Sequence, residues 1–227
     1  MKFNLQKETL RTVNDYLQNF DKKSNNRSFE IINPNGNHAI CAGLKDDIEV
    51  TVEGHAGYYC AGMNMNAQII INGNVGTGVA ENMMSGVVHV KGNASQSAGA
   101  TAHGGTLIID GNTSSRCGIS MKGVDIIVKG SVGHMSAFMA QSGNLLICGN
   151  AGDALGDSIY EARIFISGKV RSLGADCEEK KIKDKDKKIL KSLLDKAEIS
   201  SDKMKNFRMY GSARKLYNFN IDNVSEY

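Results

Sequence analysis

The sequence is poor in the residues on which most large hydrophobic cores depend. It has no tryptophan, one proline and only 6% aromatic residues, whereas 25 of its 227 residues are glycine. The charges nearly cancel, at a formal net charge of +3, which disfavours nucleic-acid binding. No apolar run approaches the ~20 residues of a membrane-spanning helix, and the start MKFNLQKETL lacks the apolar segment of a signal peptide. We therefore expect a cytoplasmic protein that binds neither nucleic acid nor membranes.

Motifs for metal or nucleotide binding are scarce. The cysteines and histidines are scattered too widely for a zinc or iron–sulfur motif; they are Cys41, Cys60, Cys117, Cys148, Cys177, His38, His55, His89, His103 and His134. Residues 73–78 have the glycine content of a phosphate loop but not the lysine of a P-loop. We expect the cysteines to be small core residues in a reducing compartment, and no metal, cofactor or catalytic site in this chain.

The dominant feature is an internal repeat between residues 48 and 175. Glycine recurs every nineteen residues, without insertion or deletion, at Gly54, Gly73, Gly92, Gly111, Gly130, Gly149 and Gly168. A fixed period of this kind is the signature of a solenoid, in which each turn of the chain repeats the shape of the previous one. Because these glycines follow short apolar segments, we expect them at sharp bends where φ is positive.

Two aliphatic columns accompany the glycines. One lies two residues before each glycine (Val52, Ile71, Val90, Ile109, Val128, Ile147, Ile166) and the other four residues before it (Val50, Ile69, Val88, Leu107, Ile126, Leu145, Ile164). Residues two apart on a strand point to the same side, so both columns are expected to face inward. No helical pattern separates the strands. The sequence therefore predicts an all-β solenoid, a right-handed parallel β-helix of about seven coils and roughly 34 Å.

Two further regions flank the repeat at residues 48–177. Residues 1–47 read as an N-terminal cap, with an amphipathic helix at 7–20 and a degenerate coil whose strands lie at 29–32 and 38–42. Residues 178–227 read as a C-terminal helical tail. A charged helix is expected at 178–191, and a second helix is expected after Ser200 or Ser201 that carries Met204, Phe207 and Tyr210. The segment 216–221 has the alternation of an edge strand.

The repeat resembles a known family. The pattern G-x-x-G-x-x-x-G, as at Gly149, Gly152 and Gly156, is similar to the C-terminal β-helix domain of glutamate synthase large subunits. Five blocks and the tail resemble the stand-alone form of that domain, the β-helix subunit of N-methylglutamate synthase: GYYCAGMN (57–64), GVAENMMSG (78–86), SRCGISMKG (115–123), GHMSAFMAQSG (133–143), GDALGDSIYEARIF (152–165) and SARKLYNFNIDN (212–223). The repeat alone is shared with the structural β-helix subunit of formylmethanofuran dehydrogenase, which remains an alternative.

The resemblance implies a subunit without an active site. It would brace a class II glutaminase-type subunit and an FMN-binding synthase subunit that carries an iron–sulfur cluster. No cysteine follows Met1, where such an amidotransferase keeps its nucleophile. A polysaccharide-cleaving β-helix is a further alternative, but the outward strand column holds only Glu49 and Asp125 as acids, and they are not adjacent.

Three surface features are candidates for contacts with partners or for self-association. The column three residues before the glycine is expected to point outward, yet it contains Ile70, Ile108, Ile127, Leu146 and Phe165. Methionines gather in the bends, at Met63, Met65, Met83, Met84, Met121, Met135 and Met139, where they form either an adaptable interface or core filling. Polar candidates in the bends are Glu81, Asn82, Arg116, Lys122, His134, Gln141, Asp153, Asp157 and Glu161.

Overall fold

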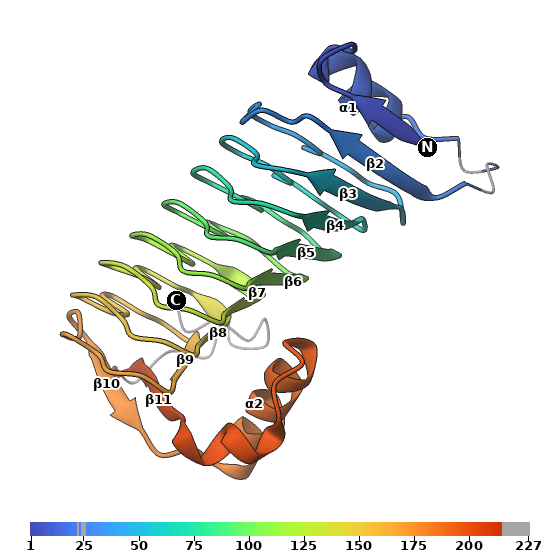
Figure 1. The fold of residues 1–227 in the computed structure, drawn as a ribbon. Helices are drawn as coiled ribbons and strands as arrows, with labels where there is room; N and C mark the ends of the chain where they lie inside the picture. The colour runs from blue at the N-terminus through green and yellow to red at the C-terminus, as the bar shows by residue number, and fades with distance from the viewer. Residues whose placement is uncertain (22, 24–25, 215–227) are drawn as a thin grey trace, which may run out of the picture.

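The computed structural model describes residues 1–21, 23 and 26–214. The chain is wound into a β-solenoid in which each coil contributes one strand to a single sheet that runs the length of the rod (Figure 1). Along the sheet the order is β1-β2-β3-β4-β5-β6-β7-β8-β9-β11-β10. The predicted β-solenoid is thus confirmed, and the seven strands β3 to β9 are the seven repeats of the sequence.

The elements have the following bounds. The strands are β1 (Lys2–Asn4), β2 (Ser28–Ile32), β3 (Glu49–Glu53), β4 (Gln68–Ile71), β5 (Val87–Val90), β6 (Thr106–Ile109), β7 (Lys122–Val128), β8 (Ser142–Ile147), β9 (Arg163–Ile166), β10 (Cys177–Lys180) and β11 (Arg208–Ser212). The helices are α1 (Leu10–Gln18), α2 (Asp184–Lys196) and the 3-10 helix η1 (Ser201–Asn206).

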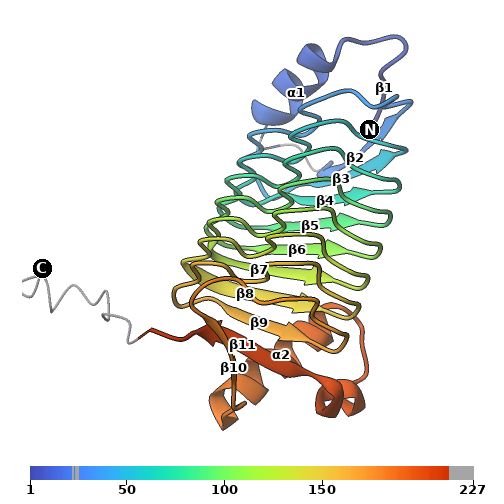
Figure 2. The same cartoon turned by 90° about the vertical axis from the view of Figure 1, so that its left-hand side faces the viewer.

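The core is built from residues that stack in register along the rod. Ile71 pairs with Val52 on one side and with Val90 on the other, a spacing of nineteen residues in both directions. Every member of the two predicted inward columns is buried, and the coils lie directly above one another in the side view (Figure 2). A third inward column, two residues after each glycine, includes Ala56, Val75 and Ala94, which form isolated parallel bridges with one another. Sequence reasoning did not identify that column.

The repeat glycines have a different role from the one expected. Of the seven, only Gly54 has a positive φ, at 133°. The other six are needed because consecutive coils approach too closely for a side chain. A Cβ at Gly111 would lie 2.5 Å from Asn93 Oδ1 and 2.7 Å from the carbonyl oxygen of Gly92. The Gly111 N–H also donates to that carbonyl, at 3.0 Å, which prevents the coils from moving apart freely.

This close approach makes a quantitative prediction. Gly111→Ala is expected to destabilise the protein by about 3 kcal/mol, because overpacking between backbones cannot be relieved by a side-chain rotation. The matched control is Gly211→Ala in β11, where the nearest atoms to a new Cβ lie 3.7 Å and 3.8 Å away. Thermal denaturation of both variants checks the difference. Equal melting temperatures would show that the coil spacing does not depend on glycine.

A relay of side-chain acceptors follows the column one residue after the glycine. Asn74 Oδ1 accepts from the backbone N–H of Asn93, Asn93 Oδ1 from Asn112, and Asn112 Oδ1 from Ser131, each at 2.8 Å. His55, Ser131 and Asn150 continue the pattern at both ends. These Asn side chains stack along the rod. Most of their hydrogen bonds nevertheless join a side-chain oxygen in one coil to a backbone N–H in the next coil, and not to another side chain. Each coil therefore satisfies a bend donor in its neighbour.

The N-terminal end of the rod lies under α1. Val13 and Leu17 pack against the core, while Asn14 and Gln18 donate to the carbonyls of Ala39 and Ala42 at 2.8 Å and 2.7 Å. These side chains satisfy backbone groups that a further coil would otherwise bind. The expected helix at 7–20 and the strand at 29–32 are present. The expected strand at 38–42 is wrong, because Ala39 and Cys41 have positive φ and form part of a turn.

At the C-terminal end of the rod, the sheet ends in two antiparallel pairings. β11 pairs antiparallel with β9, and β10 pairs antiparallel with β11. The helix expected at 178–191 begins only at Asp184, since Cys177–Lys180 is a strand. Ser200 caps η1 as expected, but Tyr210 belongs to β11 rather than to that helix. The predicted strand at 216–221 lies outside the described residues.

Candidate functional site

The bends opposite the sheet have an unusual backbone. Five, seven and nine residues after each of the first six repeat glycines, the chain adopts positive φ, as at Tyr59, Ala61 and Met63, with φ of 58°, 56° and 56°. In these six coils the middle residue is a buried Ala or Gly, and exposed outer residues such as Tyr59 and Met63 point away from the rod. The strain of these conformations is opposed by hydrogen bonds between coils, such as the 2.8 Å bond from Met63 N–H to the carbonyl oxygen of Glu81. We call this surface, formed by residues four to twelve after each glycine, the turn face.

The turn face displays methionine and tyrosine side chains. Met63, Met65, Met84 and Met139 are exposed, by 55%, 40%, 46% and 43%, whereas Met83 and Met121 fill the core. The methionines thus serve both purposes that the sequence left open. Tyr58 and Tyr59 are also half exposed, and Tyr58 stacks on His38 with ring centroids 4.5 Å apart. Exposed Met and Tyr side chains are typical of protein interfaces.

The outward apolar column is covered by the chain itself. Ile108, Ile127, Leu146 and Phe165 form a second hydrophobic cluster with residues of α2, η1 and β11, among them Leu190, Leu193, Leu194, Phe207 and Met209. Leu146 and Phe165 are fully buried, so their assignment as partner-contacting residues is wrong. The C-terminal region covers this column with apolar residues from α2, from the end of η1 and from β11, which together form a wider surface than the apolar side of α2 alone. Ile70, beyond the reach of α2, remains exposed.

The nine polar candidates lie at the surface, but they do not form one cluster. Glu81 and Asn82 line a hollow of about 190 Å³ together with Tyr59 and Met63. Gln141 and Glu161 line another of about 460 Å³ with Met139 and Tyr160, three to four coils away or roughly 14–19 Å. Asp153 pairs with Arg171, and Asp157 accepts from Ser158. Arg116, Lys122 and His134 are exposed, and the backbone N–H of Arg116 donates to the carbonyl oxygen of His134 in the next coil at 2.9 Å.

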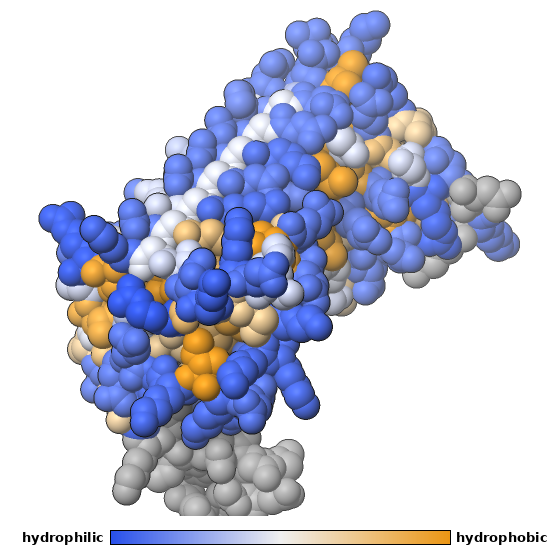
Figure 3. Space-filling view, turned by 60° about the horizontal axis from the view of Figure 1, so that its bottom comes forward, coloured by the Kyte–Doolittle hydropathy of each residue, from blue (hydrophilic) through white to orange (hydrophobic). Residues whose placement is uncertain are grey.

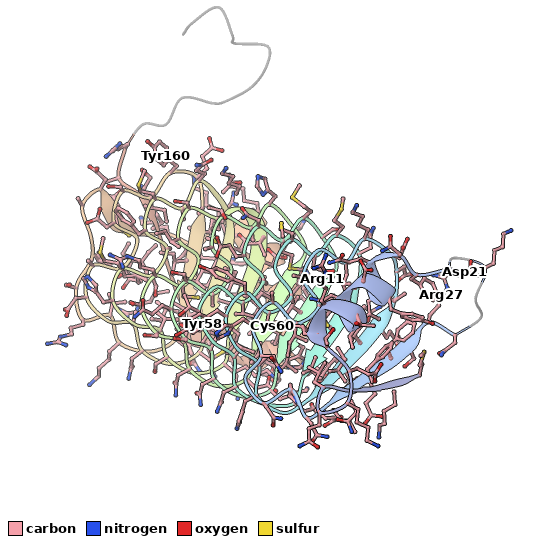
Figure 4. All side chains as sticks on the ribbon, turned by 90° about the horizontal axis from the view of Figure 1, so that it is seen from above. Arg11, Asp21, Arg27, Tyr58, Cys60 and Tyr160 are labelled. Carbon is pink, nitrogen blue, oxygen red and sulfur yellow. The ribbon has the colours of Figure 1, made fainter. Side chains whose placement is uncertain are left out.

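A larger groove adjoins the second hollow. It has a volume of about 550 Å³ and lies between the beginnings of β8 and β9, the strand β11 and the link from β10 to α2. Both hollows share Ser142, Tyr160 and Glu161, so they form one continuous depression. Tyr160 stands at the edge of the rod in Figure 4. The space-filling view shows hydrophobic patches between strongly hydrophilic side chains (Figure 3). Sequence reasoning missed Tyr160 and the lysines of the link, whose dense charge is typical of a solvated helix.

Three of the five cysteines are core residues, and Cys148 and Cys177 are partly buried. Cys41, Cys60 and Cys117 are fully buried, and burial raises the pKa of the Cys60 and Cys117 thiols to about 12. Burial also raises the pKa of Cys177, to about 11. Within the described part of the chain, no group of three or more His, Cys, Asp or Glu side chains is arranged to hold a metal ion. In residues 73–78, Gly73 packs against Gly54, Gly76 against Gly57 and Gly78 against Tyr59.

The principal charged cluster on the sheet is centred on Asp110. Its carboxylate lies 2.9 Å from His89 Nε2 and 2.8 Å from Lys129 Nζ. Partial burial alone would raise the pKa of Asp110, but the hydrogen bonds from Lys129 and His89 outweigh it, so the pKa lies below its ordinary value. Asp125, the acid of the outward column nearest this cluster, is held by Lys196 at 2.6 Å and Asn144 at 2.8 Å. These carboxylates are engaged in ion pairs rather than paired with each other for acid–base catalysis.

Among the described residues, no helix is long and apolar enough to cross a membrane. No protein-family model matches the chain. The chain is 54% identical over 218 residues to Protein GlxC of Rhizobium meliloti (strain 1021), an alignment that covers 96% of both proteins. At this identity and coverage the nineteen-residue coils, the turn face and the C-terminal elements all fall within the shared region. The chain therefore belongs to the family of Protein GlxC.

Proposed function

We propose that this protein is a non-catalytic β-helix subunit of a glutamate synthase-type complex, of the N-methylglutamate synthase kind. It braces a class II glutaminase-type subunit and an FMN-binding subunit that carries an iron–sulfur cluster. The observation that carries the proposal is the nineteen-residue repeat of the solenoid together with the sequence blocks 57–64, 78–86, 115–123, 133–143 and 152–165, which contribute most of the turn face. The exposed side chains of Tyr58, Tyr59, Met63, Met84 and Met139 lie in these blocks.

The physical character of the rod supports a bracing role. Its interior is filled by stacked aliphatic side chains that are almost completely buried. Backbone hydrogen bonds link every coil to the next, as from Ala80 to Cys60 and from Ala137 to Cys117. A rod of this kind holds two sites on its surface at a fixed separation. A stable interface requires roughly 800 Å² per partner, and a turn face built from seven coils offers room for more than one such contact.

Co-expression with a glutaminase-type and a flavin-type subunit tests the proposal. We expect one complex that contains all three chains, with FMN and iron–sulfur absorbance, whereas the rod purified alone should carry neither chromophore and should not hydrolyse glutamine. The measurements are size-exclusion chromatography with light scattering, absorbance spectra and a glutaminase assay. Stoichiometric flavin on the isolated rod, or a failure of both subunits to bind it, would overturn the proposal.

A further inference from the structure

The groove at the C-terminal end of the rod has a pronounced positive charge. Its walls carry five basic side chains, Arg163, Lys180, Lys181, Lys183 and Lys185, but only two acidic ones, Glu161 and Asp186. Two of the basic groups already have partners. Arg163 pairs with the buried Asp186, with 3.2 Å between Arg163 Nε and Asp186 Oδ1, and Lys180 pairs with Glu178. The positive potential of the groove therefore comes mainly from the remaining three lysines.

Lys181, Lys183 and Lys185 are exposed and lie around one opening. None of them takes part in the ion pairs found in the described part of the chain. Glu161 is the one acidic side chain of the groove lining that the ion pairs leave over, so an anionic group in the groove would meet a surplus of positive charge. Lys183 is also the N-cap residue of α2, where its backbone N–H donates to Asp186 Oδ2 at 3.0 Å, but its side chain forms no ion pair in the described part of the chain.

The other end of the same depression presents Met139 and Tyr160 beside the polar side chains of Gln141, Ser142 and Glu161. Met139 is 43% exposed there, and Tyr160 lies between it and the lysines. A flexible thioether beside an aromatic ring suits a hydrophobic side chain of a bound protein. A small anion would use only the lysine end. A polypeptide that carries acidic residues next to a hydrophobic one would use both ends.

We propose that this groove binds an acidic segment of a partner protein, with Asp or Glu side chains against Lys181, Lys183 and Lys185 and a neighbouring hydrophobic side chain against Met139 and Tyr160. The inference rests on the proposed function, since it supplies the contact by which one of the two subunits is held. It also adds an orientation, because the site lies at the C-terminal end of the rod, far from α1 at the other end (Figure 2).

Charge reversal tests the lysine end. The triple variant Lys181→Glu, Lys183→Glu, Lys185→Glu is expected to weaken binding of one co-expressed subunit about tenfold or more at low ionic strength, and to remove the salt dependence of that binding. The matched control is Lys188→Glu, Lys191→Glu, Lys205→Glu, which makes the same change of charge at exposed lysines outside the groove. It should bind with nearly the wild-type dissociation constant. Circular dichroism should show equal melting temperatures for both variants.

A photo-crosslinking amino acid at Met139 tests the other end of the depression in the assembled complex. We expect mass spectrometry to find it joined to an Asp- or Glu-rich segment of the subunit whose binding the triple variant weakens. If the wild-type rod assembles but the triple variant binds equally well, the groove proposal is overturned while the proposed function stands. A crosslink to residues 215–227 of the same chain would also overturn it, because the groove would then hold this chain's own segment. If the wild-type rod binds neither subunit, both proposals fail.

Discussion

Ile71→Asp is expected to prevent folding. Ile71 is fully buried and stacks between Val52 and Val90 in the inward column nearest the glycines. An unpaired carboxylate at this position lies among aliphatic side chains, which costs several kcal/mol, and the stability of a whole domain is only about 5–15 kcal/mol. In a solenoid the damage also removes the support of the coils on either side. Circular dichroism and the soluble yield measure the outcome.

The neighbouring residue provides the control. Ile70 lies in the same strand, but its side chain points out of the rod and is 39% exposed. Its partners in adjacent strands are Thr51 and His89, so Ile70→Asp should change the melting temperature by only a few degrees. A soluble Ile71→Asp protein that melts cooperatively near the wild-type temperature would contradict the register of the core.

The double variant Leu190→Asp, Leu194→Asp is expected to detach α2 from the sheet without unfolding the rod. Both leucines are buried in the second cluster, against the column of Ile108, Ile127 and Leu146. Each substitution removes about 2–3 kcal/mol of favourable free energy that comes from burying a leucine side chain. The helix keeps the buried Leu193 and Ala197 and the ion pairs of Asp186 with Arg163 and of Lys196 with Asp125, which together bury less apolar surface than the wild-type helix does.

Detachment should leave a continuous apolar strip on the rod, and such strips drive association. We expect β-rich circular dichroism, increased binding of a hydrophobic dye and oligomers whose size rises with concentration in light scattering. Lys188→Asp with Ser192→Asp is the control, because it places two new carboxylates on the exposed side of the same helix. If the leucine variant stays monomeric with unchanged dye binding, α2 is not what shields the strip.

The features that follow the nineteen-residue period could be predicted from the sequence. The aliphatic positions of Val88 and Val90 repeat in every coil, and strands stacked in parallel at one period leave a single register in which both columns face inward. The cap helix is predictable because Val13 and Leu17 recur at helical spacing. The close approach of the coils at the glycines could not be predicted. A bend with positive φ and a position without space for a Cβ both select glycine, so the sequence does not distinguish them.

The errors lie where the chain leaves its period. Phe165 does occupy an outward column, but its burial depends on where α2 and β11 return to the sheet, and no periodic signal records that path. The same is true of Lys181 and Lys185, which in sequence are indistinguishable from the solvated lysines of a helix. Their shared opening arises because the chain returns after α2 as β11, which pairs antiparallel with both β9 and β10 at the end of the sheet.

The side-chain relay beside the glycines limits how such a protein can change in length. Asn93 and Asn112 each accept from the residue nineteen positions further on, so a residue added beside the relay would misplace an acceptor unless a bulge absorbs it, as between Lys122 and Asp125. Removal or duplication of a complete coil leaves each acceptor facing an equivalent donor. The separation between the two ends of the rod is therefore adjustable only in steps of about 4.8 Å. A partner that contacts both ends of the rod must therefore differ in length by the same steps between rods with different numbers of coils.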